Sequence, residues 1–331
     1  MERRRVLQGA FAAGAVLLGA RRAFAAGDAR ASTVRLGYVG NPCEAVTFAA
    51  PGNSIFRHRS LDARLVSFDD EPSLIAALGS GGIDAATVNL PALLEPLESG
   101  ADIRLTAGLH AGCLRVVAPE AVVLRTFGNL KGARVGTERL HGPSMNLLSA
   151  LLRRQGIDPT RDISWHVCAH AELEAAFEAG SIDCAALPDP LGYALLAEKK
   201  AVPFVDTADG GFTCGDGIGR GHHCFLAVHG GLVRTRPAIA ASLTHAYVAA
   251  STAVGRGVGP WALGEVRGSY VDADLYAAIG MLSSYDWSAS TDAVLEEIEL
   301  TARDFRRAGL LARRTDPERL ANRAFADVTG G

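Results

Sequence analysis

Three cysteines and three histidines supply the side chains that are best able to do chemistry. They are Cys43, His110, Cys113, His222, His223 and Cys224. Thiolate and imidazole ligands together select Fe, Cu, Zn or Ni rather than Ca or Mg, because soft ligands prefer softer metals. A site needs about four such atoms within roughly 2.0 to 2.3 Å of the metal. We therefore expect a transition-metal site if the fold brings these residues together.

The same cysteines have two other uses that the sequence leaves open. In an oxidising compartment they can pair as disulfides, for example Cys43 with Cys113 or Cys214 with Cys224. They can also remain free buried thiols beside a histidine pair that lines a ligand site. Two further cysteines lie in apolar segments and are expected to pack in the core: Cys168 and Cys184.

Strands and helices alternate along most of the chain and must position these residues. Residues 33–39, 63–67 and 83–88 are predicted strands, and residues 71–79 are a predicted helix. This alternation predicts βαβ units and an open, mostly parallel sheet, so the expected fold class is α/β. A second series of the same kind begins near residue 129 and predicts a second lobe. No internal repeat is evident beyond this alternation.

The domain organisation follows from where the chain enters and leaves the second series. We expect lobe 1 to comprise residues 32–117 and 226–331, and lobe 2 to comprise residues 118–225. The crossing segments are expected at residues 113–118 and 222–229, side by side. Two crossings predict a hinge. The Cys/His set falls on the first cleft loop and on both crossings, so all six side chains are expected to converge.

The first 25 residues are typical of an export signal. Arg3, Arg4 and Arg5 precede an apolar run at 9–20, and small residues at 23–25 suit cleavage. The order of polar residue, arginine pair and apolar residues resembles a twin-arginine signal, with Sec export as the alternative. Removing residues 1–25 changes the formal net charge from −3 to −7, which argues against nucleic-acid binding. We expect a soluble periplasmic protein.

Several polar residues follow predicted strands, where open α/β sheets bind their ligands. Asn41 and Cys43 follow the first strand, Asn89 ends another, and the turn from Thr137 to Ser144 opens a long helix. Helix N-termini there favour an anionic or strongly polar ligand. Ser144 has a second interpretation, as the N-terminal cap of its helix. Two members of the Cys/His set complete the candidate ligand-binding residues: His110 and Cys113.

Several segments together resemble the nitrate/sulfonate/taurine-type substrate-binding proteins of ABC importers. The resemblance spans about residues 33 to 260 and is carried by segments 34–38, 82–93, 130–136, 151–158 and 180–190. It implies a type II periplasmic-binding-protein fold, with two βα lobes joined by a two-strand hinge. It also implies a monomeric solute-binding protein that delivers a small molecule or metal to a membrane permease. Asp189 matches the second-lobe cleft loop of the family and either faces the ligand or shapes the turn.

The Cys/His set departs from ordinary members of that family. Pyrimidine-forming thiamine synthases of the same fold have a Cys-Cys-Cys-Phe-Cys iron-binding run, where this chain reads His222-His223-Cys224-Phe225. The alternatives to an importer component are therefore a metal-dependent enzyme of that type and a ligand sensor. Gly-x-Ser-x-Gly, His-Glu-x-x-His and phosphate-binding loops are absent from the sequence, which favours a binding protein over an enzyme.

Overall fold

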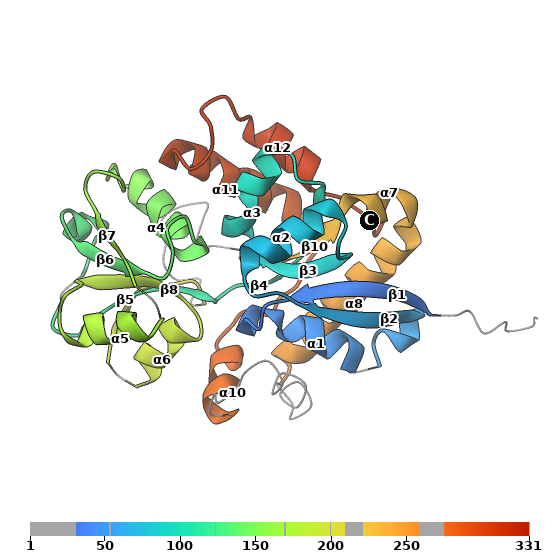
Figure 1. Cartoon of the computed structure of the whole chain (residues 1–331), viewed down its shortest axis with the longest axis horizontal. Coiled ribbons are helices and arrows are strands. Elements are labelled where there is room, and N and C mark those ends of the chain that lie inside the picture. The colour runs from blue at the N-terminus through green and yellow to red at the C-terminus, as the bar shows by residue number, and fades with distance from the viewer. Residues whose placement is uncertain are drawn as a thin grey trace, which may run out of the picture. The chain divides into compact units, whose positions relative to one another are not determined.

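Two five-stranded sheets carry the fold, as the computed structural model shows (Figure 1). The structure describes residues 31–52, 54–122, 124–168, 170–198, 200–208, 221–257 and 275–330, all within one compact unit. The expected signal peptide at residues 1–25 and Cys214 lie outside the described residues. Among those described, no helix is both long enough and apolar enough to cross a membrane.

The first sheet has the strand order β2-β1-β3-β10-β4. Strands β1, β2 and β3 are parallel, whereas β10 is antiparallel to both of its neighbours. Every residue of β3 is buried, as expected for a central strand that is covered on both faces. The strands are β1 (Ser32–Tyr38), β2 (Leu61–Ser67), β3 (Ala85–Asn89), β4 (Ile103–His110) and β10 (Cys224–His229).

Helices cover both faces of this sheet (Figure 1). Helices α1 and α8 pack together on one face, and α2 contacts β1, β3 and β10 on the other. The core lies between the sheet and these helices, and includes Leu36, Phe225 and Tyr247. The helices associated with this sheet are α1 (Ala45–Gly52), α2 (Glu71–Ser80), α3 (Leu90–Glu98), α7 (Gly230–Thr235), α8 (Pro237–Gly255), α11 (Val294–Ala308) and α12 (Pro317–Ala324), with 3-10 turns η1 (Pro42–Glu44) and η2 (Arg57–Arg59).

The second sheet repeats the same plan in the order β7-β6-β8-β5-β9. Strands β6, β7 and β8 are parallel, and β5 is antiparallel to β8 and β9. In each sheet the fourth strand therefore comes from outside the local βα series. The elements are β5 (Leu114–Ala118), β6 (Arg134–Thr137), β7 (Ser164–Val167), β8 (Cys184–Pro188), β9 (Val202–Asp206), α4 (Pro143–Arg154), α5 (His170–Glu178), α6 (Leu191–Ala197), α10 (Leu275–Ser283) and the 3-10 turn η3 (Phe127–Leu130).

The two expected crossing segments do not lie side by side as paired strands. Strand β5 belongs to the second sheet, although the sequence placed residues up to 117 in the first lobe, and β10 belongs to the first sheet. The chain instead changes sheets just before β5, at residues 111–113. The segment 286–290 runs beside this crossing. The amide of Ala111 donates to the carbonyl of Asp286, and Gly108 pairs with Ser290.

The two sheets share a local repeat that sequence inspection missed. Arg35 lies in the middle of β1, and its backbone amide and guanidinium donate to the carboxylate of Asp84 at 2.8 to 3.1 Å. Arg134 in β6 makes the same contacts with Asp183. Each aspartate follows an isoleucine and directly precedes a parallel strand, β3 or β8. One Arg–Asp pair therefore joins two neighbouring parallel strands in each sheet.

Candidate metal and ligand site

Strand order in the first sheet brings three of the candidate residues to one edge. Strand β10 runs antiparallel between β3 and β4, so its first residue lies beside the last residues of both neighbours. Cys224 at the start of β10 is in register with Asn89 at the end of β3 and with His110 at the end of β4. The antiparallel insertion of β10 therefore places a thiol, an amide and an imidazole together at the ligand-binding end of the sheet.

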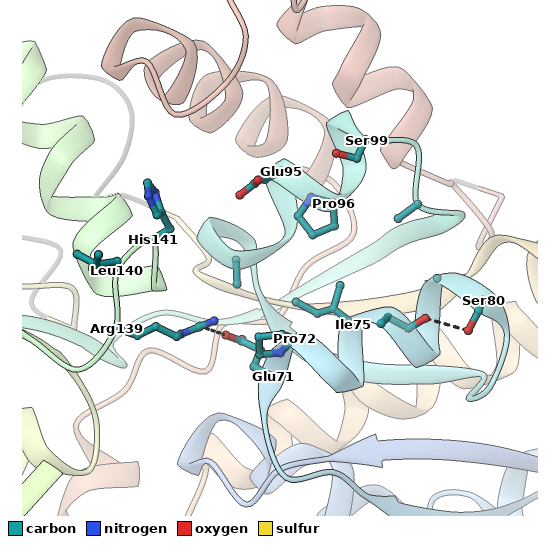
Figure 2. A pocket seen from close by; sticks show the side chains of 14 residues that line it. Glu71, Pro72, Ile75, Ser80, Glu95, Pro96, Ser99, Arg139, Leu140 and His141 are labelled. Carbon is teal, nitrogen blue, oxygen red and sulfur yellow. Dashed lines mark hydrogen bonds and ion pairs between the residues drawn. The ribbon is translucent and has the colours of Figure 1, made fainter. Parts of the chain in front are cut away.

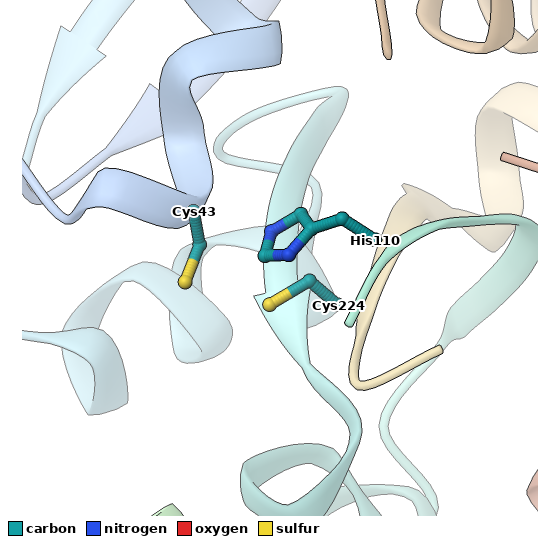
Figure 3. Close-up of side chains that lie close together, drawn as sticks. All are labelled: Cys43, His110 and Cys224. Carbon is teal, nitrogen blue, oxygen red and sulfur yellow. The ribbon is translucent and has the colours of Figure 1, made fainter. Parts of the chain in front are cut away.

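A buried carboxylate holds the loop that supplies Cys43. The side chain of Glu44 accepts hydrogen bonds from the amides of Val39, Gly40 and Asn41 at 2.7 to 2.9 Å. Burial raises the pKa of Glu44 to about 7, although these three amides oppose the shift. The loop after β1 is thereby closed back on η1, and Cys43 points toward the end of the sheet (Figure 3).

Two cysteines and one histidine converge at this edge, Cys43, Cys224 and His110 (Figure 3), and a third cysteine lies next to them. The Sγ atoms of Cys43 and Cys224 and a ring nitrogen of His110 all lie within 4.8 Å of one another. The Sγ atom of Cys113 lies 3.5 Å from that of Cys224. The amide nitrogen of Asn89 is 3.4 Å and 3.5 Å from these two sulfurs. The five described cysteines are free thiols, and three of them form this cluster.

The imidazole of His110 is fully buried and lacks polar partners among the described residues. Its exposed fraction is 0%, and neither ring nitrogen has a hydrogen-bond partner there. The ring stacks on Tyr285 with centroids 5.2 Å apart and lies 4.5 Å from the ring of Trp287. Burial lowers the pKa of His110, which favours the neutral form of the ring. A neutral, oriented imidazole with an unused nitrogen is suited to bind a metal.

The three thiols perturb one another's pKa values. Hydrogen bonds from Cys224 and Cys43 lower the pKa of the Cys113 thiol well below its usual value. The hydrogen bond to Cys113 raises the pKa of Cys43, and burial followed by the contact with Cys113 raises the pKa of Cys224. Of the three thiols, Cys113 is the one whose thiolate form its neighbours favour. Thiolates are the form of cysteine that binds metals.

The remaining two histidines of the expected set lie outside this group of ligand atoms. The Nδ1 atom of His222 is 3.0 Å from Glu297 on α11, and its Nε2 atom is 2.7 Å from the carbonyl of Ser288. Burial lowers the pKa of His222, but the contact with Glu297 outweighs it and the net pKa is raised. His223 is buried, with no partner for Nδ1 among the described residues, and it is not one of the three converging metal-ligand residues.

A cavity of about 310 Å³ opens above the thiol cluster between the loops of the two sheets. Five of the residues that sequence analysis proposed as ligand contacts line it. They are Asn41, Cys43, Asn89, Cys113 and Asp189. A much smaller cavity of about 20 Å³ lies beneath it and is lined by Cys43, Cys224 and Asn89 among others.

Thr137 and Ser144 do not line this cavity. Both side chains are buried, and neither hydroxyl has a hydrogen-bond partner among the described residues. The capping interpretation of Ser144 is wrong, because the N-cap of α4 is Gly142 and no side chain caps that helix. The neighbouring residues Glu138, Arg139 and Pro143 line the cavity instead.

Asp189 reaches the cavity, but its oxygens are already used by the protein. Its carboxylate accepts from Arg115 Nε at 3.0 Å, from the amide of Tyr193 at 2.8 Å and from the hydroxyl of Tyr285 at 2.9 Å. Burial raises its pKa to about 6, while Arg115 opposes that shift. Asp189 thus joins β5, α6 and the segment after α10, which fits its interpretation as a residue that shapes the turn.

An ion pair crosses the cavity mouth and was not anticipated from the sequence. The guanidinium of Arg139, after β6, lies 3.4 Å from the carboxylate of Glu71 at the start of α2 (Figure 2). Asp70 caps α2 through the amide of Ser73, which places Glu71 at the cavity. The same two side chains also line a second cavity of about 640 Å³. Residues 69–71 lie where the loop that follows β2 meets α2. Their place at a strand end was the signal in the sequence that could have indicated a cavity-lining residue.

Ionisation of the Glu71 carboxyl group should make the free energy of unfolding depend on pH. Burial raises its pKa from 4.5 to about 7. A raised folded-state pKa adds stability that is complete below the unfolded pKa of 4.5 and is lost as pH rises through about 7. Between about pH 4 and pH 8 the metal-free wild type should lose up to about 3 kcal/mol relative to Glu71→Gln. Urea unfolding of both proteins across that range measures this, and parallel pH profiles would contradict it.

The two-sheet architecture and the strand-end cavity define a periplasmic-binding-protein fold of type II. The model of the NMT1-like family matches residues 27–256 of the sequence, so the chain belongs to that family. The family match and the fold together confirm the resemblance to nitrate/sulfonate/taurine-type proteins that the sequence indicated. No curated protein sequence matches the chain.

Solved structures with the same fold include three binding proteins. The periplasmic aliphatic sulphonate binding protein SsuA from Escherichia coli is 19% identical, with a TM-score of 0.71 over 89% of this chain and 92% of that one. A zinc-bound ligand-binding component of an ABC-type import system from Staphylococcus aureus is 15% identical (TM-score 0.69; 90% and 98% covered). The nitrate-binding protein NrtA from Synechocystis PCC 6803 is 13% identical (TM-score 0.68; 89% and 86% covered).

Proposed function

We propose that this protein is the periplasmic solute-binding component of an ABC importer and that its solute contains a transition metal. The main observation behind this proposal is that Cys43 and Cys224 converge with the imidazole of His110, whose ring nitrogens have no hydrogen-bond partner among the described residues. Cys113 adds a third sulfur to the same cluster. Buried polar groups normally have partners, so an imidazole that lacks them indicates a missing ligand.

The distances suit a metal ion after a small adjustment. With metal–sulfur bonds of about 2.3 Å, tetrahedral ligands place two sulfurs about 3.8 Å apart. The sulfurs of Cys113 and Cys224 are 3.5 Å apart, and the ligand atoms of Cys43, His110 and Cys224 lie within 4.8 Å of one another. The cavity of about 20 Å³ beside Cys43 and Cys224 has room for one ion. Three sulfurs and one imidazole nitrogen favour Zn, Cu, Fe or Ni over hard cations.

Capture and release would then follow the usual logic of a two-lobed binding protein. The parts built on the two sheets are proposed to act as lobes that close on the solute, and a membrane permease would recognise the closed form. Export by the twin-arginine route, with cleavage after residue 25, would deliver the folded protein to the periplasm. Binding requires no catalytic group, so we propose a binding protein rather than an enzyme.

Metal content tests this function. Protein purified under reducing conditions should bind one equivalent of Zn²⁺ or Cu⁺, measured by elemental analysis and by competition with a chromophoric chelator. Alkylation and mass spectrometry of the same protein should find the cluster thiols protected by metal and reactive after its removal. Metal-free protein in which Cys113 or Cys43 is held in a disulfide would overturn the proposal in favour of a bracing role.

A further inference from the structure

The side-chain amide of Asn89 lies against two of the cluster sulfurs. Its Nδ2 atom is 3.4 Å from the Sγ atom of Cys113 and 3.5 Å from that of Cys224. The two sulfurs are themselves 3.5 Å apart, so the three atoms form a nearly equilateral triangle. Asn89 is 7% exposed, and a hydrogen bond is stronger in such a buried place than in water. The amide is therefore a buried donor shared by two of the proposed metal ligands.

Backbone pairing fixes the position of this amide. Asn89 is the last residue of β3 and is in register with Cys224, the first residue of β10. The backbone amide of Leu90 donates to the carbonyl of His223 at 2.8 Å, and the amide of His223 donates to the carbonyl of His110 at 3.0 Å. These bonds tie together the ends of β3, β10 and β4. The Asn89 side chain is thus held beside the sulfurs by the strands that carry Cys224 and His110.

The orientation of the amide suits sulfurs that are charged. Nδ2 is directed to the two sulfurs, and Oδ1 is left buried without a partner among the described residues. A thiolate accepts hydrogen bonds and has no proton to donate, so the reverse orientation would turn the carbonyl oxygen toward negative charge. Neutral thiols, in contrast, could donate to that oxygen. The arrangement therefore favours thiolates, which are the form of cysteine that binds metals.

We propose that Asn89 is a positioning residue of the metal site, and that its N–H groups donate to the metal-bound sulfurs of Cys113 and Cys224. This inference rests on the proposed function and concerns how that site holds its metal. Asn89 takes no position on the metal, because it acts through N–H groups that only donate. Its two contacts fix the directions of the thiolates and draw electron density away from the sulfurs. Groups that hydrogen-bond to metal ligands contribute about 10- to 100-fold to metal affinity.

Replacing the amide by an apolar side chain tests the inference. Asn89→Leu has a side chain of similar size that lacks N–H groups. It should bind Zn²⁺ at least about tenfold more weakly than the wild type in competition with a chromophoric chelator. In the Co²⁺-substituted protein, the sulfur-to-cobalt charge-transfer bands should move to lower energy, because sulfur lone pairs lie higher without donors. A residue that only filled space would leave these bands in place.

Two further variants complete the experiment. Asn146→Leu is the matched control, because Asn146 is 8% exposed and its amide nitrogen donates to the carbonyls of Pro91 and His141. It should retain the wild-type Co²⁺ spectrum and bind Zn²⁺ within about threefold of the wild type. Asn89→Asp keeps the shape of the amide but lacks both N–H groups, and it should show the same loss and band shift as Asn89→Leu. It tests the donor if leucine prevents folding, which circular dichroism establishes.

The results separate this inference from the function on which it rests. A folded Asn89 variant with wild-type affinity and unmoved bands would overturn the positioning role while the metal site stands. Weaker binding with unmoved bands, or an equal band shift in Asn146→Leu, would overturn it as well, because the effect would then come from packing. Failure of the wild-type protein to bind Zn²⁺ or Co²⁺ would instead overturn the proposed function.

Discussion

Replacing Cys224 by alanine is expected to weaken transition-metal binding by more than about 100-fold, because loss of an outer partner alone already costs about 10- to 100-fold. Cys224 is fully buried, lies 3.5 Å from Cys113 and is one of the three residues whose ligand atoms converge. Competition titration with a chromophoric chelator measures the dissociation constant.

Two variants control this prediction. Cys184→Ala removes an equally buried thiol from the second sheet, far from the converging ligands, and should bind metal as the wild type does. His222→Gln should also bind within about threefold of the wild type, because its ring contacts Glu297 and Ser288 instead. A Cys224→Ala protein with unchanged affinity, or a His222→Gln protein that loses the metal, would show that the ligands are misassigned.

The sheets could be predicted from the sequence because they depend on local alternation. Residues 63–67, 71–79 and 83–88 were assigned to a strand, a helix and a strand, and the structure places β2, α2 and β3 there within a few residues. The sheet to which β5 belongs could not be predicted in the same way. Its pairing with β8 and β9 joins residues that are distant in sequence, and no local pattern encodes that choice.

The site residues could be predicted where their position depends only on where a strand ends. They could not be predicted where their role depends on the direction in which the side chain points. Cys43, His110 and Cys224 each lie at the ligand-binding edge of the first sheet, so their convergence follows from topology. His222 and His223 precede the same strand, but the direction of His222 is set by Glu297, 75 residues away on α11. A spacing argument contains no information about that partner.

Asp189 shows the same limit for a charged residue. Its place after a strand made it a candidate ligand contact, and it does line the cavity. Its oxygens are nevertheless taken by Arg115 and Tyr285, because Leu114 is in register with Pro188 and brings the guanidinium beneath the turn. Only the register of β5 against β8 distinguishes a structural aspartate from a ligand contact here.

Replacing Asp189 by asparagine is therefore expected to cost about 3 kcal/mol of unfolding free energy, because it leaves a buried guanidinium short of its main partner. Arg115 and Asp189 are 2% and 0% exposed, and Asp206 remains as the second partner of Arg115. The matched control is Asp183→Asn, which alters an Asp–Arg pair with exposures of 34% and 43% and should cost much less unfolding free energy than Asp189→Asn. Chemical unfolding at neutral pH compares them. An Asp189→Asn protein that keeps its stability but loses its solute would return this residue to the ligand site.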